Sequence, residues 1–267
     1  MTSAPGRAGR QAPAALGSGV FASADVIAAL VRRDIQSRLT GNFLGFGWTY
    51  VVPLVWIAGT YFAFYLFGRR VPVYTDTITF IISGLVPYIG FRYAVNAVSR
   101  TNAAMQRLLI FPTVKLEHGV VSSALLEWVN VFVVFALVAA LNALLFGNGE
   151  MDDPLRWVFG TTLACALGAS YAYFFVALTE IRPGFRQLGI VLLRPAFFIS
   201  GIFFTSNELP ERVLPLFLWN PLLHAVEISR SGMLDHYEAR AVSAAYPLAW
   251  IAGMIALAAA VRLTQRN

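Results

Sequence analysis

Residues 118–146 read HGVVSSALLEWVNVFVVFALVAALNALLF, a run of 29 residues in which Glu127 is the single Asp, Glu, Lys or Arg. A helix of about 20 apolar residues crosses the roughly 30 Å of hydrocarbon in a bilayer. This stretch is therefore long enough and apolar enough to cross a membrane as one helix.

Five further apolar stretches surround this one, so we predict an all-α integral membrane protein with six transmembrane helices. Polar or turn-forming segments separate most of them, such as GRRVP at 68–72 and GNGEMDDP at 147–154. We expect one transmembrane domain over residues 22–267, preceded by a disordered cytoplasmic tail over residues 1–21. The predicted spans are approximately 44–67, 77–98, 118–146, 155–179, 188–205 and 243–262, and the fifth is the shortest.

The composition favours lipid over water as the surroundings of these helices. Hydrophobic residues make up 58% of the chain and charged residues 13%, whereas soluble domains carry about 25% charged residues. So few charged side chains could not cover the surface of a soluble protein of this size. The net charge of +6 does not predict a nucleic-acid partner, because the basic residues punctuate apolar runs instead of gathering on one face.

The distribution of arginine and lysine predicts the orientation of the chain, since basic residues favour the cytoplasmic side of a membrane. If the N-terminus is inside, twelve basic residues fall in cytoplasmic segments and six fall outside. Both termini are therefore predicted to be cytoplasmic. The six on the outer side are Arg69, Arg70, Arg156, Arg212, Arg230 and Arg240.

An amphipathic helix is predicted over residues 22–39, directly before the first span. Its apolar residues recur at four-residue steps, and its arginines lie on other faces. A basic amphipathic helix beside a span is typical of a helix that lies in the membrane interface. The alternative is an ordinary solvated basic helix. The apolar positions are Ile27, Val31, Ile35 and Leu39, and the basic ones are Arg32, Arg33 and Arg38.

The segment between the fifth and sixth spans is apolar but broken by proline. Residues 213–228 read VLPLFLWNPLLHAVEI, with Pro215 and Pro221 inside the run. Sixteen residues interrupted in this way do not span a bilayer, whereas a re-entrant or interfacial pair of short helices fits them. We predict re-entrant helices over residues 208–233 on the outer side, with a break at Asn220–Pro221. The alternative is an extracellular loop.

Motifs for catalysis and cofactor binding are missing from the sequence. It contains no Gly-x-x-x-x-Gly-Lys-Ser/Thr for a nucleotide, no His-Glu-x-x-His for zinc and no Gly-x-Ser-x-Gly elbow. The three histidines show no metal-ligand spacing, and a lone cysteine cannot form an intrachain disulfide. We therefore expect no catalytic residue, metal or cofactor on this chain.

Ionisable side chains within the predicted spans are the first candidates for a functional role. Glu127 lies in the third span, Arg194 in the fifth, and Arg92 in the second beside Tyr88. A charge at membrane depth is costly and usually faces a polar cavity or a partner. One interpretation is a pathway for a polar substrate, and the other is a structural ion pair, such as Glu127 with an arginine. A further interpretation of Arg92 is that its long side chain extends to the membrane–water interface.

Several motifs, in order along the chain, resemble one family of membrane proteins. They run from about residue 25 to the C-terminus, and the longest is LWNPLLHAVE at 218–227, followed by Ser229 and Arg230. Together they are similar to the membrane subunits of ABC-2 type polysaccharide exporters, and most of all to capsular polysaccharide export permeases of the KpsM type. The other motifs are Arg32-Arg33-Asp34 with Arg38, Leu44-Gly45-x-x-Trp48 with Pro53, SGLVPY at 83–88, ALLE at 124–127 and LRPAFFIS at 193–200.

The resemblance implies a division of labour between chains. Two copies of this chain would pair with two ATP-binding cassette subunits that hold ATP and Mg. The complex would export a lipid-linked capsular polysaccharide across the bacterial inner membrane, with a periplasmic polysaccharide co-polymerase adaptor as a further partner. The alternatives are another cargo, such as an O-antigen, a teichoic acid or a small hydrophobic drug, and, in a different class, an intramembrane enzyme.

The resemblance also implies roles for individual residues. The segment 99–113 would couple the chain to the ATPase, and the helix 22–39 would assist it. The coupling residues would be Arg100, Gln106, Arg107 and Phe111, together with Arg32 and Arg33. Together with the ionisable residues of the spans named above, the candidates for the substrate pathway are Arg92, Glu127, Arg194, Tyr88, Trp219, Asn220 and Glu227.

Overall fold

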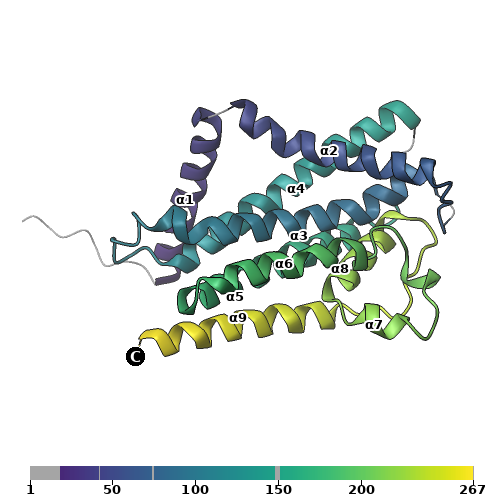
Figure 1. The fold of residues 1–267 in the computed structure, drawn as a ribbon. Helices are drawn as coiled ribbons and strands as arrows, with labels where there is room; N and C mark the ends of the chain where they lie inside the picture. The colour runs from purple at the N-terminus through teal and green to yellow at the C-terminus, as the bar shows by residue number, and fades with distance from the viewer. Residues whose placement is uncertain (1–18, 42, 74, 148–150, 267) are drawn as a thin grey trace, which may run out of the picture.

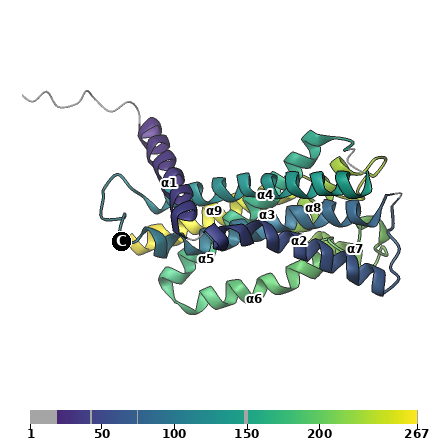
Figure 2. The same cartoon turned by 90° about the horizontal axis from the view of Figure 1, so that it is seen from above.

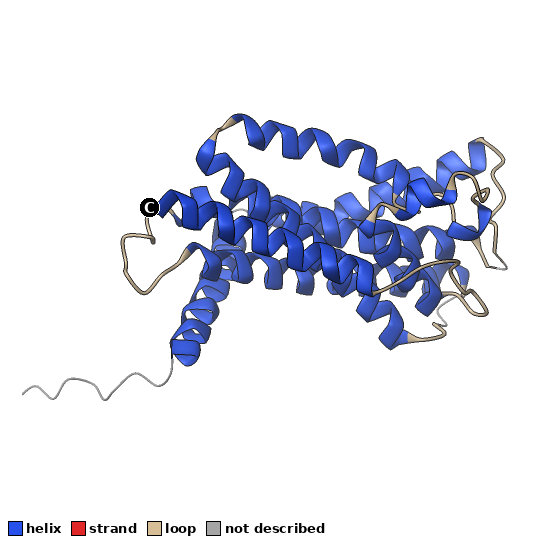
Figure 3. Cartoon of the chain, turned by 90° about the horizontal axis from the view of Figure 1, so that it is seen from below, coloured by secondary structure: helices blue, strands red, loops and turns tan. Residues whose placement is uncertain are grey.

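A computed structural model of the chain describes residues 19–266 except 42, 74 and 148–150. These residues form helices joined by loops, and no strand occurs among them (Figure 3). The predicted tail lies mostly outside the described residues, but its last residues already belong to the first helix. The helices are α1 (Gly19–Gly41), α2 (Phe43–Leu66), α3 (Thr77–Met105), α4 (Leu116–Phe146), α5 (Pro154–Ile181), α6 (Gly184–Ile199), α7 (Leu214–Leu218), α8 (Pro221–Met233) and α9 (Ala245–Arg266), with a short 3-10 helix η1 (Ser206–Glu208).

Most of the long helices run alongside one another, whereas α1 crosses one end of the bundle (Figures 1 and 2). The last turn of α9 lies at the same end as α1, and α7 and α8 lie toward the opposite end. The two ends of the described chain are therefore on the same side of the bundle.

Five helices in the described part of the chain are long and apolar enough to cross a membrane: α2, α3, α4, α5 and α9. They correspond to five of the six predicted spans. The remaining prediction, 188–205, corresponds to α6, which has 16 residues and is about 24 Å long. This helix ends at Ile199, and Gly201 follows with a φ of +75°, a left-handed conformation that cannot continue an α-helix.

The centre of the bundle is formed by α3 and α5, with α8 packed against both. Glycines on α5 permit this close approach. A Cβ atom at Gly168 would collide with the backbone of Phe91 in α3, and one at Gly160 would collide with the backbone of Ser229 in α8. Small residues at membrane helix interfaces bring backbones together and strengthen packing.

The apolar face of α1 packs partly against protein. Leu30 lies in a small core with Met105 at the end of α3, Leu116 at the start of α4 and Val176 of α5. Since α3 continues to Met105, the first residues of the predicted coupling segment 99–113 extend that helix, and the chain then turns before α4. The amphipathic helix α1 therefore packs against the first residues of the segment 99–113.

The predicted break in the proline-containing segment is confirmed. Helix α7 ends at Leu218 and α8 begins at Pro221. Asn220 is the N-cap of α8, and its side-chain oxygen accepts a hydrogen bond from the Leu222 amide at 3.1 Å. Proline at the first helical position needs no hydrogen-bond partner for its nitrogen, which explains why the new helix starts there.

Candidate functional site

Two cavities, each of about 730 Å³, flank the half of α3 that lies toward α1. We call the first the ion-pair cavity. It lies among α1, α2, α3 and α4, and its lining includes Asp34, Arg38, Trp48, Tyr93, Asn96, Arg100, Ser123 and Glu127.

Glu127 is held in the ion-pair cavity by a salt bridge. Arg38 Nη2 donates to Glu127 Oε1 at 2.6 Å, and Asn130 Nδ2 donates to Glu127 Oε2 at 2.9 Å. The side chain of Glu127 is 7% exposed and that of Arg38 is 28% exposed. A buried carboxylate is costly unless it is paired, so this contact stabilises the packing of α1 on α4. Of the two interpretations of Glu127, an ion pair with an arginine is thus present, and its partner comes from α1.

We call the second cavity the arginine cavity, and it lies among α3, α5 and α6. Helix α6 packs on α5 and stands away from α3 over this stretch. Among the described residues that line it, none has an acidic side chain. Its polar and aromatic lining consists of Tyr88, Phe91, Arg92, Asn96, Ser99, Arg100, Asn102, Gln106, Tyr171, Phe175, Thr179, Arg186 and Arg194.

The four arginines of this cavity are exposed and lack acidic partners. None of them forms an ion pair with an acidic side chain in the described part of the chain. Arg92 instead lies over the ring of Trp56 in α2, with its guanidinium carbon 5.0 Å from the ring centre. Such a contact compensates only a small part of the cost of a charge at membrane depth.

An aromatic cluster adjoins the arginine cavity. Phe197 of α6 lies between Trp56 and Tyr88, with ring centres 5.1 and 5.2 Å away. Trp56 and Tyr88 are themselves 6.5 Å apart. The local sequence does not mark Trp56 or Phe197 as site residues, because their position depends on how α2 and α6 meet α3. Tyr88 is almost fully buried and Trp56 and Phe197 are half-buried, so these rings pack mainly on one another.

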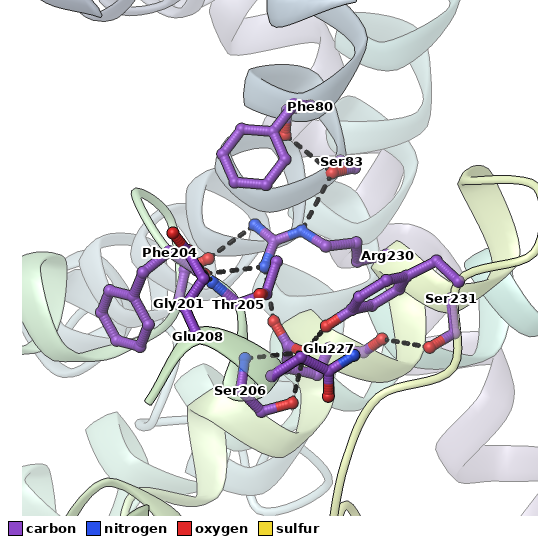
Figure 4. A network of polar contacts seen from close by, with 12 residues as sticks. Phe80, Ser83, Gly201, Phe204, Thr205, Ser206, Glu208, Glu227, Arg230 and Ser231 are labelled. Carbon is purple, nitrogen blue, oxygen red and sulfur yellow. Dashed lines mark hydrogen bonds and ion pairs between the residues drawn. The ribbon is translucent and has the colours of Figure 1, made fainter. Parts of the chain in front are cut away.

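A buried polar network holds the segment after α6 against α8 and α3 (Figure 4). Arg230 is completely buried; its Nη1 donates to Glu227 Oε1 at 2.5 Å and to the Phe204 carbonyl at 3.0 Å, and its Nε donates to Ser83 Oγ at 3.2 Å. Its guanidinium also lies 4.7 Å from the centre of the Phe80 ring.

The other oxygen of Glu227 completes this network. It accepts hydrogen bonds from the Ser206 hydroxyl at 2.9 Å and from the Tyr237 hydroxyl. Burial raises the pKa of Tyr237, with the charge of Glu227 adding to the effect, so this hydroxyl stays protonated and able to donate. Glu227 lines neither cavity. Through these contacts Glu227 holds α8 against the segments that contain Ser206 and Tyr237.

The other pathway candidates fall into separate groups. Arg92, Arg194 and Tyr88 meet in the arginine cavity, whereas Glu127 lies in the other one. Asn220 donates to Ser200 Oγ at 2.9 Å and so ties α8 to the end of α6, and the neighbouring Trp219 is 77% exposed. These two residues lie away from both cavities.

The coupling candidates are divided in the same way. Arg100 lines both cavities, and Gln106 lines the arginine cavity. Arg107 and Phe111 are exposed on the turn between α3 and α4, next to Ile110, which is 80% exposed. On α1, Arg32 is exposed and Arg33 is paired with Asp34 at 3.1 Å.

Across the ranges that the structure describes, no three His, Cys, Asp or Glu side chains are grouped as a metal site would require.

Residues 25–234 match the family model of the ABC-2 type transporter. The chain belongs to the ABC-2 type transporter family.

Several relatives within this family bear the names of polysaccharide exporters. The polysialic acid transport protein KpsM of Escherichia coli is 28% identical, over 82% of this chain and 85% of its own length. The O-antigen export system permease protein RfbA of Klebsiella pneumoniae is 27% identical over 79% of this chain and 83% of its own. The capsule polysaccharide export inner-membrane protein BexB of Haemophilus influenzae is 28% identical over 78% of each chain.

Proposed function

We propose that this chain is the transmembrane permease subunit of an ATP-driven exporter that carries a lipid-linked capsular polysaccharide across the bacterial inner membrane. The observation that carries the proposal is the family match over residues 25–234, together with relatives named for capsule export. The absence of a nucleotide-binding motif in the sequence agrees with an ATPase on a separate chain.

Six membrane crossings with both termini in the cytoplasm form part of this proposal. The position of α1 and the end of α9 on the same side of the bundle supports an even number of crossings, and α6 with the segment 200–205 would make the sixth. The excess of basic residues on the side of the termini supports the orientation. The short helices α7 and α8 would then be re-entrant from the periplasmic side.

The polar face of α3 and α6 supports a homodimer. Exposed arginines at membrane depth are costly against lipid, so this face would line a water-filled path between two copies of the chain. Two ATP-binding subunits, with their ATP and Mg, would dock on the turn between α3 and α4, where Ile110 and Phe111 are exposed. A periplasmic adaptor would meet the opposite end near α7.

Deletion and complementation in the source bacterium test this function. We expect loss of surface capsule with accumulation of the lipid-linked polymer inside the cell, and recovery when the chain is restored. The ATP-binding subunit should co-purify with the restored chain. Unchanged surface capsule in the deletion strain would reject the proposal.

A second cargo is supported by the relatives named as O-antigen permeases. The same deletion strain separates the two cargoes, because the glycan that accumulates inside the cell identifies what the chain exports. Accumulated O-antigen with normal capsule would replace capsule with O-antigen as the cargo.

A further inference from the structure

One arginine of the C-terminal helix joins three helices at the end of the bundle where α1 lies. Arg262 of α9 donates from Nη1 to Glu117 Oε1 at 2.9 Å and from Nη2 to Glu180 Oε1 at 2.8 Å. Glu117 lies in the first turn of α4, and Glu180 is the last residue but one of α5. We call these three side chains the three-helix clasp.

The clasp has a specific geometry and is partly shielded from water. The side chain of Arg262 is 12% exposed, and those of Glu117 and Glu180 are 43% and 28% exposed. The guanidinium carbon of Arg262 also lies 5.1 Å from the centre of the Tyr173 ring in α5. A guanidinium holds its donors in one rigid plane, so a single arginine can fix two carboxylates at set positions. The ends of α4, α5 and α9 are therefore held relative to one another by Arg262.

The start of α4 is also fastened to α1 and α3. Leu116, the first residue of α4, lies in one small core with Leu30 of α1 and Met105 of α3. A Cβ atom at Gly119 would collide with the side chain of Met105, so α4 begins in close contact with the end of α3. The first turn of α4 is thus held by α1 and α3 through apolar packing and by α9 through the clasp.

The clasp connects two places that the proposed function links. The turn between α3 and α4, residues 106–115, directly precedes the first turn of α4. At the other carboxylate, three residues separate Glu180 from Gly184, where α6 begins. Helix α6 forms one wall of the arginine cavity. A displacement of the turn can therefore pass through Glu117, Arg262 and Glu180 to the start of α6.

We infer that Arg262 is a positioning residue for transport. It holds the turn between α3 and α4 at a fixed position relative to the start of α6, so that a movement of the turn driven by ATP hydrolysis also moves the wall of the path. This inference rests on the proposed function, in which the ATP-binding subunit docks on that turn. Arg262 lines neither cavity. Its loss should therefore uncouple hydrolysis from transport without removing a contact to the cargo.

The number of glycan molecules transported per ATP hydrolysed tests the inference. Both quantities are measured on one preparation of proteoliposomes that contain the chain and its ATP-binding subunit, with a labelled lipid-linked capsular polysaccharide as cargo. We expect Arg262→Gln to lower this ratio at least about threefold while hydrolysis stays within about twofold of wild type. Arg262→Lys should recover part of the ratio, because it keeps the charge but loses the planar fork.

Variants of the carboxylates test each link of the clasp separately. Glu117→Gln breaks the link to α4 and Glu180→Gln breaks the link to α5, and both should stay folded because these side chains are partly exposed. Each should lower the ratio. Glu117→Gln combined with Arg262→Gln should be no worse than Arg262→Gln alone, since the two residues act through one contact.

Arg182→Gln is the matched control. Arg182 is an exposed arginine just after α5, and it forms no ion pair with an acidic side chain in the part of the chain that the structure describes. Its substitution removes the same charge at the same end of the bundle without touching the clasp. The ratio should stay at the wild-type value.

Three results would overturn the inference. They are a wild-type ratio in Arg262→Gln and in both carboxylate variants, an unchanged ratio because transport and hydrolysis fall together, or an equal fall of the ratio in Arg182→Gln. The second result would leave the clasp a purely structural role. Failure of the wild-type chain to assemble with an ATP-binding subunit would instead reject the proposed function, and this inference with it.

Discussion

At the scale of single residues, the structure separates charges that hold the bundle together from charges that lack a partner. Glu127 and Glu227 both lie in apolar stretches of sequence, and both are paired with an arginine. Arg92 and Arg194 come from similar stretches but face a cavity whose described lining contains no acidic side chain. Their sequence surroundings do not distinguish the two classes, since each partner lies on another helix or another turn.

The Arg38–Glu127 pair should stabilise the attachment of α1 to α4. Glu127→Gln leaves Arg38 without a counter-charge, and because Arg38 is partly exposed we expect a loss of about 1–3 kcal/mol, less than for a fully buried pair. Thermal unfolding of the purified chain in detergent measures it. Arg33→Gln is the control, because its pair with Asp34 is more exposed and should contribute below about 1 kcal/mol. Equal stability of Glu127→Gln and wild type would contradict a stabilising pair.

The Arg230–Glu227 pair should contribute more to stability than the Arg38–Glu127 pair, because both of its side chains are fully buried. Glu227→Ala leaves the Arg230 charge uncompensated, and we expect a loss of about 3–5 kcal/mol and little folded protein in the membrane. Glu211→Ala removes an exposed carboxylate paired with Arg240 and should have little effect. Normal amounts of folded Glu227→Ala protein with defective export would instead indicate a direct role in the pathway.

At the scale of helices, the order of elements follows from apolar runs and proline, but their contacts do not. Residues 118–146 predict α4 closely, and Pro221 marks the start of α8. The short α6 was harder to predict, because the apolar run 188–205 does not reveal that Gly201 adopts a left-handed conformation. The arginine cavity depends on α6 standing away from α3, a tertiary feature with no local signal.

Close packing of α5 on α8 should depend on Gly160. A Cβ there would collide with the backbone at Ser229, so Gly160→Ala should lower the thermal stability of the detergent-solubilised chain. Gly59 in α2 has open space at the Cβ position, and Gly59→Ala should be neutral or stabilising by up to about 1 kcal/mol. Similar unfolding temperatures for both variants would show that α5 and α8 do not pack this closely.

The connection between α7, α8 and α9 should be sensitive to acid through His224. Its Nδ1 accepts from the Ser243 amide at 3.0 Å, and its Nε2 donates to the Leu218 carbonyl at 2.9 Å, an arrangement that needs the neutral ring. Burial lowers the pKa of His224 below its usual value of 6.5, although the Leu218 carbonyl and the charge of Glu227 oppose the shift.

The sign of the pH effect follows from that lowered pKa. The unfolded chain takes up the proton more readily, so the stabilising contribution is full above about pH 6.5 and is lost as the pH falls from there through the folded-state pKa. Melting curves between pH 8 and pH 5 measure it. His224→Asn, which cannot titrate, should show a smaller loss over this range. If the variant lost as much thermal stability at low pH as the wild type, the pH effect would belong to other groups.

At the scale of the whole molecule, the proposed function gives this chain the membrane path and leaves the energy source to another subunit. The two cavities flank α3 near the end that carries α1 and the turn between α3 and α4, so a movement of that turn can reach the lining of both cavities through one helix. Length, composition and motif order were enough to predict this class of protein. To know which charged side chains line the arginine cavity, one also needs the packing of α3, α5 and α6.

ATP-driven transport by the purified components tests the central claim most directly. Proteoliposomes would contain the chain and its ATP-binding subunit, oriented with the ATPase outside, and would receive a labelled lipid-linked capsular polysaccharide and ATP. We predict that the glycan becomes protected from an added glycosidase only when both chains and hydrolysable ATP are present. Protection by the chain alone, or none with the complete complex and ATP, would contradict the account.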